Sequence, residues 1–243
     1  MSTPCGAPGE GQVSEDPNLD RLERTLKELG SLADDLCLVG GCTAGLLITD
    51  EGAAPVRPTV DVDLIIEVVH YAQYQKQVVT QMKARGFEEG QAEGDPICRW
   101  RKADLVVDIM PVTDGVLGPT NRWYASAMKH KKTATLPGGT TAHHIDAPHF
   151  LATKLQAFEG RGAGDFAGSH DMEDVMRVID GRPTIVEEVR NAPEDLRLYV
   201  RTMLREAKGA PYFLEAMPEY FQGDEERVPI VTARLNEILE TSR

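Results

Sequence analysis

The sequence predicts an α+β protein, with a mixed sheet and flanking helices followed by a C-terminal helical domain. Two observations predict this class. The first half alternates short apolar runs with segments whose apolar residues recur every three or four positions, whereas from Pro148 onward only the helical period remains. We therefore expect a disordered lead-in at 1–17, an α/β domain at 18–146 and a helical domain at 147–243.

The elements follow from local patterns, taken in chain order. Leucines at positions 19, 22, 26, 29 and 32 predict an amphipathic helix over 19–32. In the remainder of the first half, apolar runs between turn residues predict strands at 36–39, 60–68, 98–100, 105–110, 133–136 and 140–145, with helices at 42–48 and 71–85. The second half predicts helices at 150–159, 171–179, 184–191, 194–206 and 227–239.

Composition limits the classes of function. The chain of 243 residues has a formal net charge of -13, so its overall field does not attract nucleic acid. A local cluster of Arg122, Lys129, Lys131 and Lys132 could still bind RNA such as tRNA or a triphosphate, or it is a solvated strand start. No apolar run approaches the roughly 18 residues of a membrane span. The N-terminus does not resemble a signal peptide, and the four cysteines form no C-x-x-C pair. We expect a cytoplasmic protein without a membrane partner.

Carboxylates interrupt two apolar strands. Asp61 and Asp63 alternate with valines, so they share one face of the predicted strand, where their charges repel each other. A second apolar run carries Asp108, which would join them if the two strands are neighbours. Oxygen ligands of this kind suit Mg²⁺, and two ions can bind both the attacking and the leaving oxygen in phosphoryl-type transfer. The alternative is a strand end with solvated aspartates.

A glycine turn precedes the carboxylates. Gly40 and Gly41 lie between an apolar strand and a predicted helix, where backbone N–H groups can point at a phosphate. Thr43 could add a hydroxyl. The pattern is neither a Walker-type loop nor a dinucleotide fingerprint, and an ordinary Gly-Gly turn is the alternative.

Together these motifs resemble the nucleotidyltransferase superfamily of the DNA polymerase beta type. The likeness rests on the strand before Gly40-Gly41, on "RPTVDVD" at 57–63 and on the later strand with Asp108. The resemblance implies that Gly40 and Gly41 hold the triphosphate of an NTP such as ATP. It also implies that Asp61 and Asp63 bind Mg²⁺ and that Asp108 is the third acid of the site.

The segment "KLQAFEGRGAGDFAGSHDMEDV" at 154–175 is similar to the helical motif of minimal, AbiEii-like nucleotidyltransferases, many of which are toxins of toxin–antitoxin pairs. On that likeness Lys154 contacts the triphosphate, and Arg161, Asp165 and Asp171 shape the nucleotide pocket. Asp171 is alternatively a first-turn acid favoured by the helix dipole.

The expected function is the transfer of NMP from an NTP to a hydroxyl acceptor with release of pyrophosphate. The acceptor could be an RNA or tRNA 3′ end, a protein or a small molecule, and a toxin of this kind would have an antitoxin protein as partner. The alternative is a binding or regulatory module that keeps the fold without turnover.

Overall fold

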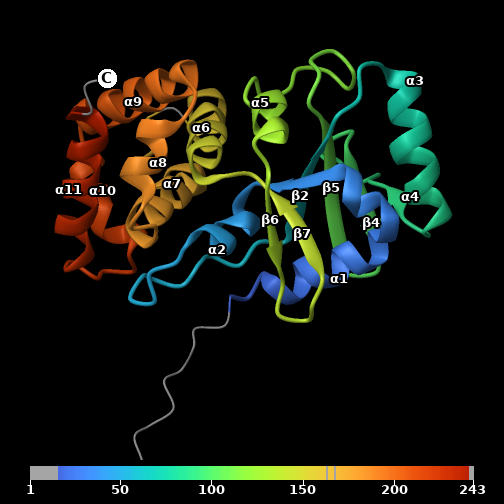
Figure 1. Cartoon of the computed structure of the whole chain (residues 1–243), viewed down its shortest axis with the longest axis horizontal. Coiled ribbons are helices and arrows are strands. Elements are labelled where there is room, and N and C mark those ends of the chain that lie inside the picture. Colours follow the sequence, from blue (N-terminus) through green and yellow to red (C-terminus); the bar gives the residue numbers. More distant parts are fainter. Residues whose placement is uncertain (1–15, 163, 167, 241–243) are drawn as a thin grey trace, which may run out of the picture.

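A mixed β-sheet forms the first half of the molecule. The structure is a computed structural model that describes residues 16–162, 164–166 and 168–240, so the lead-in predicted for 1–17 lies almost entirely outside the described residues. Within those residues, seven strands pair in the order β3-β4-β5-β2-β1-β7-β6 (Figure 1). The strands are β1 (Leu36–Val39), β2 (Asp61–Ile66), β3 (Glu88–Glu89), β4 (Arg99–Lys102), β5 (Leu105–Pro111), β6 (Lys132–Thr135) and β7 (Thr141–His144).

Helices flank the sheet and make up the second half of the chain. The first half contains α1 (Leu19–Leu29), α2 (Ala44–Leu47), α3 (Tyr71–Tyr74), α4 (Thr80–Ala84) and α5 (Tyr124–Lys129), with 3₁₀ turns η1 (Gly30–Asp35) and η2 (Gly41–Thr43) and a π-helical turn η3 (Gln75–Val79). The second half contains α6 (Ala147–Ala157), the π-helical turn η4 (Phe158–Gly162), α7 (His170–Gly181), α8 (Ile185–Asn191), α9 (Glu194–Gly209), α10 (Phe213–Tyr220) and α11 (Arg227–Glu240). The predicted class, a mixed sheet followed by a helical region, is confirmed.

The centre of the sheet brings the predicted carboxylates together. β2 is antiparallel to β1 and parallel to β5, and in the second pairing Asp63 lies directly opposite Asp108. Both strands are apolar runs apart from their acids, as expected for strands covered on both faces. The sequence could suggest the two strands but not their register, which depends on pairing between distant segments.

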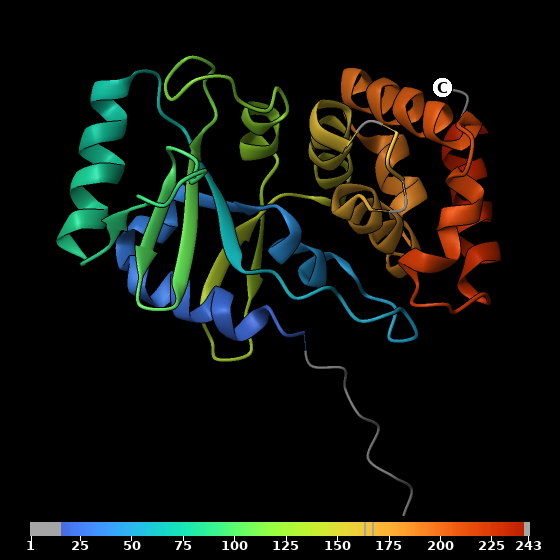
Figure 2. The ribbon, with the colours of Figure 1, turned by 180° about the vertical axis from the view of Figure 1, so that it is seen from behind.

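The two faces of the sheet differ in what covers them. Val62 and Leu64, each at most 1% exposed, pack with α1 and the α3–α4 segment, which lie on one side of the sheet (Figure 2). Asp61 and Asp63 point to the other side because side chains alternate along a strand. Val60, the first residue of the strand predicted over 60–68, precedes β2 and is 71% exposed.

The helical region is tied to the sheet. A buried cluster contains residues of β1, β2 and α2 together with residues of α6 to α11, so one apolar core spans both halves of the chain. The loop before β2 also contacts α7, because the backbone N–H groups of Thr49 and Asp50 both donate to the carbonyl of Gly181. Arg227 adds ion pairs to Asp50 and Asp180 at 2.8 Å. The division into two domains at residue 146 stays a prediction.

Three elements were not predicted. β3 is a two-residue edge strand, and α5 and α10 are short helices whose sequences carry too few turns for a periodic signal. The helix expected over 42–48 is shorter than predicted, since η2 occupies its first turn. Among the described residues, no helix is long and apolar enough to cross a membrane.

Candidate functional site

A cavity of about 810 Å³ lies between the carboxylate face of the sheet and the helices α6 and α7. One wall comes from β2, β4, β5 and the glycine turn, and the opposite wall comes from α6, η4 and the start of α7. The charged residues that line it are Arg57, Asp61, Asp63, Arg99, Asp108, Lys154, Arg161, Asp165 and Asp171. The cavity therefore alternates cationic and anionic groups, which suits a ligand carrying phosphates together with a metal ion.

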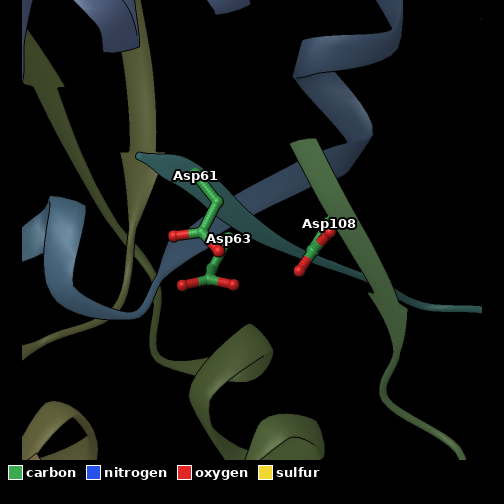
Figure 3. A group of neighbouring side chains, drawn as sticks. All are labelled: Asp61, Asp63 and Asp108. Atoms are coloured by element: carbon green, nitrogen blue, oxygen red, sulfur yellow. The ribbon is translucent and has the colours of Figure 1, made fainter. Parts of the chain in front are cut away.

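Three carboxylates converge on the sheet wall. Asp61, Asp63 and Asp108 each offer an oxygen such that these oxygens lie within 4.8 Å of one another. Figure 3 shows the three side chains pointing to the same side of β2 and β5. Asp108 is 5% exposed, while the side chain of Asp61 is 35% exposed at the mouth. Hard oxygen donors at this separation can hold a divalent cation such as Mg²⁺.

The glycine turn lets Asp63 occupy its place. Gly40 has φ 71° and ψ -171°, a conformation that is nearly exclusive to glycine. A Cβ on this residue would lie 2.0 Å from Oδ2 of Asp63. Because Gly40 has no side chain, the backbone of the turn can approach the Asp63 carboxylate closely. The turn thus lies next to the acidic triad, by which we mean Asp61, Asp63 and Asp108.

Asp63 carries a charge that its neighbours compensate only in part. Burial raises the pKa of its carboxyl from the ordinary 3.8 to about 7, and the neighbouring Asp61 and Asp108 add to the rise, while Lys154 and Arg161 partly offset it. A divalent cation would remove this cost by pairing with the carboxylate. The acidic triad therefore fits a metal ion chemically as well as geometrically.

Arg99 also lies against the triad, and the sequence analysis missed it. Its Nη2 donates to Asp61 Oδ2 at 2.8 Å and to Asp108 Oδ2 at 2.7 Å, and its Nε donates to Asp108 Oδ1 at 2.8 Å. Arg99 lies directly opposite Asp108 in the β4–β5 pairing. The alternation of Arg99 and Arg101 around the buried Trp100 was the available signal, since it puts both arginines on the face opposite to the core.

The helical wall carries a second charge cluster. Nζ of Lys154 lies 3.1 Å from Asp171 and 2.7 Å from Asp174, and Arg161 makes two hydrogen bonds to Asp171 at 2.8 and 2.9 Å. Burial lowers the pKa of Lys154, but Asp174 and Asp171 more than offset this, so the pKa is raised and the lysine is charged. Arg161 is 71% exposed and lies at the rim.

A further cation, Arg57, comes from the segment before β2. Arg57 lies 3.8 Å from Glu173 and 4.0 Å from Asp174, and its Nε is buried without a hydrogen-bond partner. Asn18 fixes this segment, because its side chain donates to the carbonyl of Arg57 and accepts from the backbone N–H of Thr59. Arg57 is thus held at the cavity with capacity to bind an anion.

Most of the predicted site residues line this cavity. Gly40, Gly41, Asp61, Asp63, Asp108, Lys154, Arg161, Asp165 and Asp171 all do. Thr43 is different, because it is fully buried and its hydroxyl donates to the carbonyl of Val39 at 2.8 Å. Among the described residues, none of the basic cluster lines the cavity; this cluster consists of Arg122, Lys129, Lys131 and Lys132.

Comparison with solved structures finds chains of similar structure. The sequence matches no protein-family model and no curated protein. Its structure is similar to the antibiotic-resistance factor ANT(2'')-Ia, with a TM-score of 0.47 and 13% sequence identity over 78% of this chain and 94% of that chain.

Proposed function

We propose that the protein is an Mg²⁺-dependent nucleotidyltransferase that moves NMP from an NTP such as ATP to a hydroxyl acceptor. The observation that carries this proposal is the acidic triad on one wall of a cavity whose opposite wall presents Lys154 and Arg161. A triphosphate needs cations for its oxygens, and a metal site needs carboxylates, and this cavity offers both.

The metal ligands and the glycine turn have separate roles in the proposed reaction. Asp61, Asp63 and Asp108 would hold Mg²⁺, which when bound neutralises charge on the triphosphate and polarises the α-phosphate. The turn at Gly40 and Gly41 lets phosphate oxygens approach the backbone, as the close approach of Asp63 to Gly40 already illustrates.

Three cations complete the binding of the triphosphate. Lys154, Arg161 and Arg57 border the cavity and can pair with phosphate oxygens. Lys154 and Arg161 would then contact both the nucleotide and Asp171. Asp165 and Asp171 line the part of the cavity next to η4 and α7, where we place the remainder of the nucleotide.

The bond changes are those of a displacement at phosphorus. The acceptor oxygen forms a bond to the α-phosphorus, the bond from that phosphorus to the bridging oxygen of the β-phosphate breaks, and pyrophosphate leaves. The proton of the acceptor hydroxyl goes to a carboxylate, for which we propose Asp108, the most buried acid of the triad.

The decisive experiment follows the label from two forms of one NTP. Protein is incubated with Mg²⁺ and with ATP labelled at the α- or at the γ-phosphate, in the presence of total RNA, total protein or small hydroxylated molecules. We expect transfer of the α-label alone, to one acceptor class, by wild type and by Asp34→Asn, whose exposed carboxylate lies outside the cavity. Asp61→Asn should transfer none.

Two outcomes contradict the proposal. Transfer of the γ-label would indicate a kinase-type reaction, and absence of metal-dependent ATP binding would remove the site itself. The acceptor class that gains label identifies the substrate, which we propose to be an RNA or tRNA 3′ end, a protein or a small molecule.

The likeness of 154–175 to toxin-type enzymes is the basis for a proposed role in the cell. We propose that the protein acts in the cytoplasm, where NTP and Mg²⁺ are available, as the toxin of a toxin–antitoxin pair. Induced expression of wild type should then arrest growth, expression of Asp61→Asn should not, and co-expression of an antitoxin protein should restore growth. Unchanged growth with wild type would exclude the toxin role, and the proposed transferase activity would still stand.

A further inference from the structure

A cation supplied by the chain itself already lies on the acidic triad. The guanidinium of Arg99 binds one oxygen of Asp61 and both oxygens of Asp108 at 2.7 to 2.8 Å. In the described part of the chain, none of its contacts involves Asp63. Since Arg99 is anchored on β4, one side chain bridges two strands and two of the three carboxylates.

The charges of the site are balanced by one divalent ion rather than two. With all three carboxylates ionised, as a bound metal ion would keep them, the triad carries three negative charges. Arg99 is hydrogen-bonded to the triad and neutralises one of them, so a single divalent ion completes the balance among the groups in direct contact. A second divalent ion would add excess positive charge next to a guanidinium, at a separation where like charges repel strongly in a partly buried site. A triphosphate would bring the negative charge that a second ion needs.

We propose that Arg99 occupies the second cation position of the triad in the free protein. One divalent ion then binds at Asp61 and Asp63, and the position at Asp108 opens only when the guanidinium leaves. This inference rests on the proposed function, because it concerns the same metal site. It makes Arg99 a positioning residue that couples completion of the metal site to arrival of the nucleotide.

The structure contains a second partner for the guanidinium. Nη1 of Arg99 lies 3.5 Å from Oδ1 of Asp95, a carboxylate that Arg101 and the backbone N–H of Ala92 hold in place. Rotation of the Arg99 side chain toward Asp95 would free Asp108, while the β4–β5 pairing keeps the backbone of both residues fixed. The displaced cation thus stays paired instead of entering water unpartnered.

The test counts bound Mn²⁺ by the electron paramagnetic resonance signal of the free ion, with calorimetry for the affinities and no nucleotide present. Wild type should bind one ion. Arg99→Gln should bind two, with the second at least about tenfold tighter than any second ion of wild type. Arg24→Gln is the matched control, because the guanidinium of Arg24 pairs with the exposed Asp104 outside the cavity, and this variant should bind one.

Each other outcome contradicts the inference in an identifiable way. Two ions bound by wild type, or one bound equally by wild type and Arg99→Gln, would overturn the role of Arg99 while leaving the metal site. Binding of no Mn²⁺ by either protein would remove the metal site, and with it both the proposed function and this inference. Should Arg99→Gln not fold, Arg99→Met also removes the charge while keeping a long, flexible side chain, and the absence of a second bound ion in that variant would count against the inference.

Discussion

Replacement of Gly40 by alanine tests the close approach on which the metal site depends. The backbone at Gly40, with φ 71° and ψ -171°, costs a residue with a side chain about 1–3 kcal/mol of folding free energy. The new Cβ would also lie 2.0 Å from Oδ2 and 2.7 Å from Cγ of Asp63, whereas ordinary contacts begin at 3.4 Å. The carboxylate therefore has to move by roughly an ångström or more, since Gly40 directly follows β1 and Asp63 lies within β2.

Such a displacement exceeds what a metal site tolerates, because Mg²⁺ requires nearly ideal octahedral distances. We expect Gly40→Ala to lose about 1–3 kcal/mol in the free energy of unfolding and to bind the ion about 10–100-fold more weakly. Urea unfolding in the presence of a chelator measures the first quantity, and titration with Mn²⁺ measures the second.

Gly139→Ala separates backbone strain from the contact with Asp63. Gly139 also has a positive φ, 87°, but nothing lies within 4 Å of the position of its Cβ. This variant should lose stability and bind Mn²⁺ as wild type does. If Gly40→Ala also binds Mn²⁺ as tightly as wild type, Asp63 is not a ligand and the reasoning about the glycine turn is wrong.

Three further predictions follow from burial and charge. Because the pKa of Asp63 is raised to about 7, the folded protein binds an extra proton between pH 4 and 7 and loses stability as pH rises through that range. In urea unfolding without metal, the free energy of unfolding of Asp63→Asn should therefore exceed that of wild type by roughly 2–4 kcal/mol above pH 7 and match it near pH 4. Asp34→Asn should show no such difference from wild type. Lys154→Met leaves two buried carboxylates without their shared cation, so a loss of about 3 kcal/mol is expected in thermal unfolding, and an unchanged melting temperature would refute the pairing. Burial raises the pKa of Cys37 and Cys42 to about 12, so a thiol reagent at pH 8 should modify these two residues only after unfolding, and rapid labelling of either residue in the native protein, located by peptide mapping, would contradict their burial.

The carboxylates show how far a local pattern can go. Alternation along β2 put Asp61 and Asp63 on one face, and this holds in the structure because the period of a strand is a property of its backbone. Their meeting with Asp108 required an assumption about which strands are neighbours. The structure confirms that adjacency, with Asp63 opposite Asp108.

Other features had weaker local signals. The residues of α5 and α10 form helices that are too short for periodicity to reveal, and packing against longer helices stabilises them. For Thr43, a hydroxyl beside a glycine turn suggested a phosphate contact, and in the structure this hydroxyl donates to the carbonyl of Val39.

The sequence by itself determined the class of fold, the face on which Asp61 and Asp63 lie, and the glycine turn beside them, because these depend on backbone periodicity and on the residue types within a few positions. Only the tertiary structure decided that Arg99 binds Asp61 and Asp108, and that Lys154 lies between Asp171 and Asp174 across the cavity. Ion pairs of this kind join segments that are distant in the chain, and their partners are chosen by strand register and helix packing, to which no local pattern refers.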